Sequence, residues 1–225
     1  MKWSGLSCLM VLPLLLCLSG CATESNRRLE VEKPLAADLY YSGPRASIAV
    51  GNFDNRSGFL RGIFSDGDDR LGSQAKTILI THLSQTNHFN VLDRDNMDAA
   101  RREAEILGEA QDLIGAYYLV SGDVSEFGRR EVTDYQFFGI LGRGKRQIAY
   151  SKVNLNIVDI RSSAVVYSVQ GAGEYELSDR EVLGFGTTAG YDSTLNGKVL
   201  DLSIREAVDR LIEAINSGLW RPLGA

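Results

Sequence analysis

Hydrophobic residues alternate with polar or small residues over three consecutive stretches in the middle of the chain, at 116–127, 147–160 and 165–173. A repeat of two residues is typical of a β-strand with one buried face. No helical pattern separates the three stretches, so we predict three strands that pair as an antiparallel meander. The residues predicted to face the core are Tyr118, Val120, Val124, Ala149, Ser151, Val153, Leu155 and Ile157.

Strand and helix patterns on both sides of the meander complete one predicted domain. The predicted elements are strands at 46–53 and 89–92 and helices at 73–86, 97–107 and 203–217. This order predicts an α/β (α+β) fold in which about three helices cover a mostly antiparallel sheet. In the first strand, Ile48, Val50 and Asn52 are predicted to share one face. The predicted buried face of the last helix consists of Ile204, Val208, Leu211, Ile212 and Ile215.

Short polar residues mark where each helix is predicted to begin. Ser73 and Asp95 are the predicted N-caps of the first two helices, because a side-chain oxygen there accepts an N–H of the first turn. Ser203 and Glu206 have the spacing of a capping box at the start of the last helix. Gly108 is predicted to end the second helix.

Two β-hairpin inserts are predicted, at about 126–147 and 170–200, and both are longer than an ordinary hairpin loop. In the first insert, hydrophobicity alternates over the eleven residues Glu131–Leu141, which is long enough for a strand that spans lipid. Gly142–Lys145 is the predicted turn. The face expected toward lipid holds Tyr135, Phe137 and Leu141.

Charged residues distinguish the second insert from the first. Asp179, Arg180 and Glu181 are consecutive, so alternation would direct at least one charge toward lipid, where an arginine at the midplane costs about 2–4 kcal/mol. The loop Asp54–Gly72, after the first strand, is also unusually long for a compact domain. It carries an aromatic pair, Phe59 and Phe64, that is predicted to be exposed.

The N-terminus has the pattern of an export signal. Lys2 precedes the apolar run Leu9–Leu18, which is too short for a permanent membrane span. The following Leu-Ser-Gly-Cys21 resembles the lipobox of bacterial lipoproteins, which implies cleavage before Cys21 and attachment of diacylglycerol and a palmitate-like acyl chain there. We therefore predict a signal peptide at 1–20, a lipidated tether at 21–44 and a domain at 45–225. Ala22, where an inner-membrane retention signal would have aspartate, favours the outer membrane.

Charge and motif content limit the chemistry that the chain could perform. Without Lys2, 23 basic residues stand against 29 acidic ones, a formal charge of −6, and this well-mixed acidic balance argues against a nucleic-acid partner. Gly139–Arg146 resembles a P-loop but lacks the Ser or Thr that holds Mg²⁺. Ser73–Lys76 matches the S-x-x-K pattern of penicillin-recognising enzymes, but the other elements of those enzymes are missing. Asp66–Asp69 resembles part of a calcium-binding loop but lacks its glutamate. His82 and His88 are interpreted as ordinary surface or core-edge residues. We predict no catalytic residue, no cofactor and no metal, and hence no enzyme.

Several short patterns carry a family resemblance. They are the lipobox, Val50-Gly51-Asn52 before a long loop, Phe137–Ile140, Val153–Val158 with Ser168-Val169, and Gly218-Leu219-Trp220 after the last helix. Together they resemble the curli-secretion channel lipoproteins, the CsgG and HfaB family. The resemblance implies a ring of protomers in the outer membrane, in which each contributes two hairpins to a shared barrel and the loop after the first strand narrows the channel. Unfolded polypeptide would pass through without ATP.

Two functions remain open from the sequence. The first is a homo-oligomeric outer-membrane lipoprotein in protein secretion, which exports or assembles a surface structure, as in curli assembly, and acts on a secreted polypeptide. The second is a periplasmic adaptor or activator lipoprotein that forms no pore and binds an envelope enzyme or machine. In both, acylated Cys21 holds the domain to membrane lipid from the periplasm. The charged second insert favours the adaptor, and a ring of protomers would favour the channel.

Overall fold

The computed structural model describes residues 31–59, 69–136, 142–182 and 195–222. The chain divides into two units, Met1–Glu32 and Lys33–Ala225, and the second contains every described element. In chain order these are the 3₁₀ helix η2 (Leu35–Asp38), β1 (Ala46–Asn55), α2 (Arg70–Gln85), β2 (Phe89–Leu92), α3 (Met97–Leu107), β3 (Tyr118–Gln136), β4 (Gly142–Asp159), β5 (Val165–Val182) and α4 (Leu195–Asn216).

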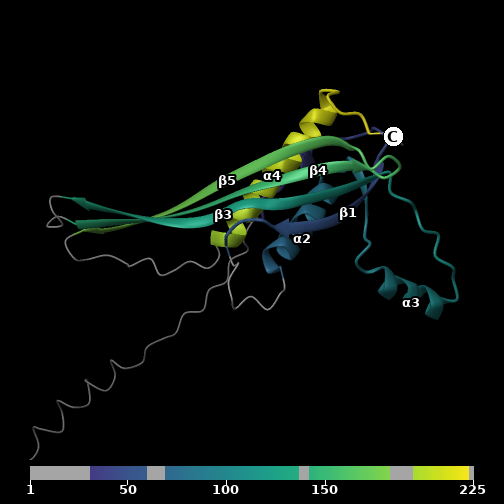
Figure 1. Ribbon diagram of the computed structural model, residues 1–225, viewed down its shortest axis with the longest axis horizontal. Coiled ribbons are helices and arrows are strands. Elements are labelled where there is room, and N and C mark those ends of the chain that lie inside the picture. Colours follow the sequence, from purple (N-terminus) through teal and green to yellow (C-terminus); the bar gives the residue numbers. More distant parts are fainter. Residues whose placement is uncertain (1–30, 60–68, 137–141, 183–194, 223–225) are drawn as a thin grey trace, which may run out of the picture. The chain divides into compact units, whose positions relative to one another are not determined.

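The five strands form one mixed sheet in the order β2-β1-β3-β4-β5 (Figure 1). β3, β4 and β5 pair antiparallel over nearly their full length, which confirms the predicted meander. β1 lies between β2 and β3 and pairs parallel with both. The α/β prediction is therefore confirmed, and the antiparallel part of the sheet is the longer one.

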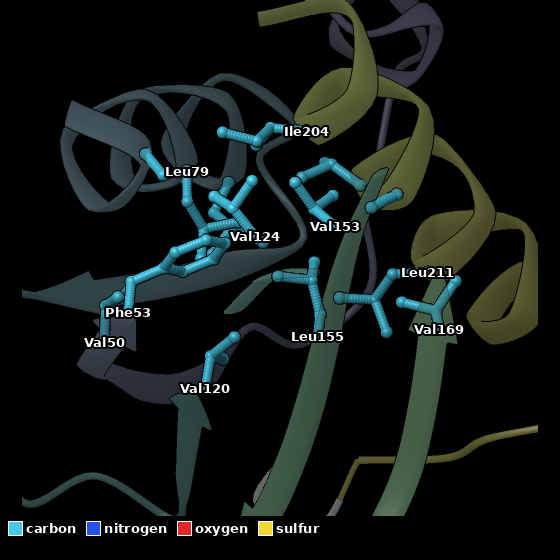
Figure 2. Packing of buried hydrophobic residues seen from close by; sticks show 14 of the residues in the cluster. Val50, Phe53, Leu79, Val120, Val124, Val153, Leu155, Val169, Ile204 and Leu211 are labelled. Atoms are coloured by element: carbon cyan, nitrogen blue, oxygen red, sulfur yellow. The ribbon is translucent and has the colours of Figure 1, made fainter. Parts of the chain in front are cut away.

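The hydrophobic core lies between one face of the sheet and the helices α2 and α4 (Figure 1). All eight meander residues predicted to face the core are buried. Leu211 of α4 lies beside Leu155 and Val169 of the sheet (Figure 2), and Leu211 and Leu155 are completely buried. Burial of one such leucine contributes about 1.5–3 kcal/mol relative to exposure, so this layer supplies much of the stability.

A β-bulge changes the alternation along β1. The register with β3 shifts between Val50 and Phe53. Phe53 and Asn55 are buried after the shift, whereas Asn52 is exposed. The prediction that Asn52 shares the face of Val50 is wrong, because one extra residue reverses the direction of every side chain that follows.

Two helices begin at other caps than those predicted. The N-cap of α2 is Asp69, whose carboxylate accepts the N–H of Gly72, and Ser73 lies inside the first turn. The N-cap of α3 is Asn96, while the carboxylate of Asp93 accepts the N–H groups of Asp95 and Asn96. Both predicted caps, Ser73 and Asp95, are therefore wrong. The predicted end of α3 is confirmed, because Gly108 has the left-handed conformation with φ 72°.

The predicted capping box lies within α4 and does not begin it. Described α4 runs from Leu195, so Ser203 is inside the helix and completely buried. Its Oγ lies 2.9 Å from the carbonyl oxygen of Leu200 and 3.0 Å from Oγ of Ser151. A serine that returns its hydrogen bond to its own helix can be buried in that helix, which explains why the capping pattern misled the prediction.

A candidate assembly ribbon

β3, β4 and β5 continue together past the part of the sheet that α4 covers (Figure 1). We call residues 128–136, 142–150 and 174–182 the ribbon. The first turn of α4 contacts its base: Nε of Arg129 donates to Oδ1 of Asn196 at 2.8 Å, and Nζ of Lys198 lies 5.3 Å from the centre of the Tyr175 ring. The described strands stay paired as far as Gln136, Gly142 and Val182.

The predicted hairpin boundaries need correction. Gln136 pairs with Gly142, so β3 ends at Gln136 and the connection to β4 lies within 137–141, outside the described residues. The predicted turn, Gly142–Lys145, is the first part of β4. Its two glycines indicated a turn, but pairing on both sides keeps them extended. Phe137 and residues 183–194 of the second predicted insert also lie outside the described residues.

Charged residues lie opposite one another in the register toward the end of the described strands. The register rows there are Thr133–Lys145–Asp179, Asp134–Gly144–Arg180 and Tyr135–Arg143–Glu181. Tyr135, which was predicted to face lipid, thus pairs with Arg143 of the neighbouring strand. Each of the three rows contains charged residues, whereas strands that span lipid need an apolar face.

Ion pairs bridge the strands at the base of the ribbon. Arg130 and Glu174 approach to 3.4 Å, as do Arg146 and Glu176, and Lys152 lies 3.7 Å from Glu126. These side chains are exposed, so each pair contributes only about 0–1 kcal/mol. An open depression of about 350 Å³ lies beside them, lined by Glu126, Tyr150, Lys152 and Glu174, among others. A surface of this composition suits water or a polar protein partner.

The ribbon has two edges without a strand partner in the described part of the chain. Beyond Val124, β3 pairs only with β4, and β5 pairs only with β4 along its whole length. Backbone N–H and C=O groups on such an edge are available to another strand.

The loop between β1 and α2 is fixed at both ends. Nδ2 of Asn55 donates to the carbonyl of Phe59 at 2.8 Å, and the Phe59 ring lies 4.7 Å from that of Phe127 on β3. Phe59 is therefore half-buried, contrary to the predicted exposure. At the other end, Asp69 of the predicted cation loop serves as a helix cap. Residues 60–68, including Phe64 and Asp66, lie outside the described residues.

The end of the predicted tether is docked on the domain. Ala36 is buried, and its N–H points to Oδ1 of Asp209 on α4 at 3.4 Å. Burial raises the pKa of Asp209, and the N–H groups that it accepts oppose that shift. The Tyr41 ring stacks on His88, with ring centres 4.0 Å apart. Cys21 lies outside the described residues, so its lipidation remains a prediction.

Both histidines are buried and hydrogen-bonded. Nε2 of His82 lies 2.9 Å from Oδ1 of Asp201, and Nδ1 of His88 lies 2.7 Å from the carbonyl of Thr86. Within the described ranges, no group of three metal-ligating side chains comes together. None of the described helices has the length and apolar character to cross a membrane.

Similarity to known proteins identifies the family. Residues 41–224 match the family described as curli production assembly/transport component CsgG. The chain belongs to the CsgG family. The predicted resemblance is thereby confirmed, and the matched residues include the whole described ribbon.

Two of the similar proteins are named as lipoproteins. A protein of Neisseria meningitidis serogroup B, named as a putative lipoprotein, is 65% identical over 205 residues, which are 91% of this chain and 92% of the relative. Among solved structures, the PelC dodecamer from Paraburkholderia phytofirmans matches with 16% identity and a TM-score of 0.35, over 75% of this chain and 93% of PelC. Lipoprotein GNA1162 from N. meningitidis matches with 18% identity and a TM-score of 0.33, over 76% and 99%. Family and relative together support a lipid-anchored envelope protein.

Proposed function

We propose that this protein is an outer-membrane lipoprotein that assembles from identical copies and serves the export or assembly of a surface structure. The family description, curli production assembly/transport component, supports the process. The lipoprotein relative and the lipobox support the anchor at Cys21, with the domain in the periplasm. The role is one of transport or assembly and not of catalysis.

The ribbon is the observation that carries this proposal. Its two outer strands, β3 and β5, belong to opposite edges of one three-stranded unit. Two different edges on one molecule allow head-to-tail pairing between copies, which closes into a ring when the rotation between copies permits. Main-chain hydrogen bonds along added strands would supply the affinity.

The charged residues of the register rows bear on where the ribbon lies. Arg143, Lys145 and Arg180 occupy three successive register rows toward the end of the described strands. Each basic residue near the midplane of a bilayer costs about 2–4 kcal/mol, and the cost falls to about 0–1 kcal/mol near the interface. We infer that these rows lie in water or against protein.

A second candidate, the adaptor without a pore, is favoured by the same charged rows. In that case, a lipid-anchored monomer presents the ribbon and the depression at Tyr150 to an envelope enzyme or machine. The two candidates differ in stoichiometry, since an adaptor needs no second copy.

The mass of the lipidated full-length protein in detergent separates the candidates. We expect rings by electron microscopy and a single multiple of the protomer mass by native mass spectrometry. A uniform monomer at all protein concentrations would exclude the oligomer and leave the adaptor.

The position of the ribbon can be measured in the same particles after reconstitution into vesicles. A fluorophore on Arg146→Cys, in the ribbon, should be quenched by aqueous iodide as strongly as one on the matched control Arg210→Cys, on α4 away from the ribbon. Quenching of the position 146 label by brominated lipid alone would place this part of the ribbon in hydrocarbon.

A further inference from the structure

The helix α3 has an apolar side that is largely exposed in the described protein. None of its residues is buried: Met97 and Ala104 are half-buried, and Leu107 is 73% exposed. Met97, Ala100, Ala104 and Leu107 recur at helical spacing and form a stripe along the helix. Figure 1 shows α3 apart from the sheet. A helix of eleven residues is marginal in water by itself, so it needs a surface to pack on.

The topology indicates which kind of surface α3 suits. The connections β1-α2-β2 and β2-α3-β3 both join parallel strands of one sheet, and they run in opposite directions across it. Nearly all such crossovers are right-handed, so a reversal of direction moves the helix to the opposite face. α2 lies on the core face together with α4. A crossover helix at the position of α3 therefore belongs on the other face, which we call the open face.

The open face carries an apolar row beneath the position of such a helix. One row of register partners crosses all five strands and consists of Leu92, Ala49, Leu119, Val158 and Val165. Ala49 is buried, and Leu92, Leu119 and Val158 are half-buried. Val165, in contrast, is 58% exposed, and the adjacent Val166 is 40% exposed.

The same face is polar farther along the strands. There Nδ2 of Asn154 donates to Asp123 at 2.9 Å, and Nε2 of Gln170 donates to Asn154 at 2.7 Å. These side chains satisfy one another, so the apolar row is the part of the open face that needs a cover.

The start of α3 is tied away from its own open face. Nζ of Lys76, on α2, lies 2.6 Å from the carboxylate of Asp95, directly before α3. α2 packs on the core face, so this ion pair holds the start of α3 toward that side. Arg94 donates to the carbonyl of Ile114 at 2.6 Å and so joins the two ends of the β2–β3 connection that contains α3. The described conformation thus places the start of α3 next to α2 and not over its own row.

One pair of charges borders the two apolar surfaces in a compatible way. Glu103 flanks the α3 stripe, and Arg161 is exposed at the β4–β5 turn beside the row. A helix packed over the row with Glu103 toward the turn would bring these opposite charges together.

We propose that α3 of one copy packs its apolar stripe on the open-face row of a second copy. This inference rests on the proposed homo-oligomer and names a contact within it. The exchange gives each copy the crossover helix that its own α3 does not provide, and a head-to-tail contact of this type is compatible with a ring.

Cysteine crosslinking between two differently tagged copies tests this contact. One copy carries Leu107→Cys on the stripe and the other Val165→Cys on the row, both in the full-length lipidated protein in membranes. A short bismaleimide should yield a product that contains both tags. The matched control, Arg102→Cys with Val165→Cys, places the thiol on the opposite side of α3 and should reduce the product to the level without added cysteine.

Native mass spectrometry of the same preparations separates failure of this contact from failure of the proposed function. An intact oligomer without the two-tag product would overturn the α3 contact alone. A further variant carries Leu107→Cys and Val165→Cys in the same chain. Crosslinks only within that chain would indicate closure of α3 on its own row and would also overturn the contact. A monomer without the product would overturn the oligomer together with the contact.

Discussion

The Asp69 carboxylate accepts the backbone N–H of Asn55 at 2.6 Å and, through its other oxygen, the N–H of Gly72 at 2.8 Å. One side chain thus joins the end of β1 to the start of α2. The long loop between these elements has a fixed base, because Asn55 also holds Phe59 and Ser57 by hydrogen bonds.

Replacement of Asp69 by alanine should destabilise the domain. The variant leaves the N–H of Asn55, a buried residue, and one N–H of the α2 first turn without their acceptor, and the expected loss is about 1–3 kcal/mol of unfolding free energy. Urea denaturation of the domain without its signal and lipid measures this. The control is Asp54→Ala, because Asp54 is exposed on β1. Equal midpoints for the two variants would contradict the structural role of Asp69.

The same region shows what local sequence patterns could and could not predict. Ser73 looked like an N-cap because an apolar periodicity follows it, yet Asp69 takes that position. The choice depends on Asn55, which lies fourteen residues earlier in the chain and uses the second carboxylate oxygen. The alternation of β4 was predictable because Val153, Leu155 and Ile157 follow a strict period of two. The bulge in β1 was not, because it results from the register with β3.

The ribbon was predictable in part. Alternation from Glu131 onward indicated a long strand, but its pairing with β4 decided where it ends. The charge around Tyr135 could not be read from one strand, since Tyr135 is uncharged by itself and comes into one register row with Arg143 and Glu181 only through strand pairing. Likewise, α3 was predicted with its correct bounds, although no local signal showed that it would lie apart from the sheet.

A methyl group at Gly171 should force β5 and α4 apart. A Cβ there would overlap the carbonyl oxygen of Ser203 and approach the backbone nitrogen of Ala207 to 2.6 Å. Overpacking of a close contact costs about 1–3 kcal/mol, so Gly171→Ala should lower the melting temperature. Gly115→Ala is the control, because a Cβ there meets no atom within 4 Å. A melting temperature unchanged from that of Gly115→Ala would show that α4 can move without cost.

Acid should weaken the β4–β5 turn through Asp159. Hydrogen bonds from the Ser162 N–H and hydroxyl, and then from the Arg161 N–H, hold the pKa of Asp159 below its ordinary value of 3.8. The stability that this carboxylate contributes is present above pH 3.8 and is lost as the pH falls through the lowered pKa. Melting curves should therefore show a larger deficit of Asp159→Asn relative to the wild type at pH 6 than at pH 3.

Asp209 provides a comparison of opposite sign. Burial raises its pKa, so its stabilising contribution is present below its ordinary value and is lost as the pH rises through the raised pKa. Asp209→Asn should accordingly gain stability relative to the wild type between pH 3 and pH 6. Parallel pH profiles for the two variants would contradict this assignment of signs.

Loss of the lipid-bearing thiol should release the protein from membranes. Cys21→Ser removes the predicted acylation site, and multiple acyl chains are what stable anchoring requires. We expect no incorporation of labelled palmitate and recovery of the variant in the soluble periplasmic fraction. The control is Ser19→Ala, which keeps a small residue before Cys21 and should leave both readouts unchanged. Membrane retention of Cys21→Ser with no palmitate label in the wild type would refute the lipid anchor.

Arginine substitutions near the end of β3 test where the ribbon lies. Tyr135 and Gln136 are adjacent in β3, so strand alternation would direct them to opposite faces. If the face of Tyr135 met hydrocarbon, Tyr135→Arg would cost about 2–4 kcal/mol per copy near the midplane, and Gln136→Arg on the other face much less. Every copy in a ring repeats that cost, so heat-resistant oligomer would disappear for Tyr135→Arg alone. We expect instead equal amounts of oligomer in outer membranes for both variants, because the register row of Tyr135 contains Arg143 and Glu181 and we propose that this row lies outside hydrocarbon.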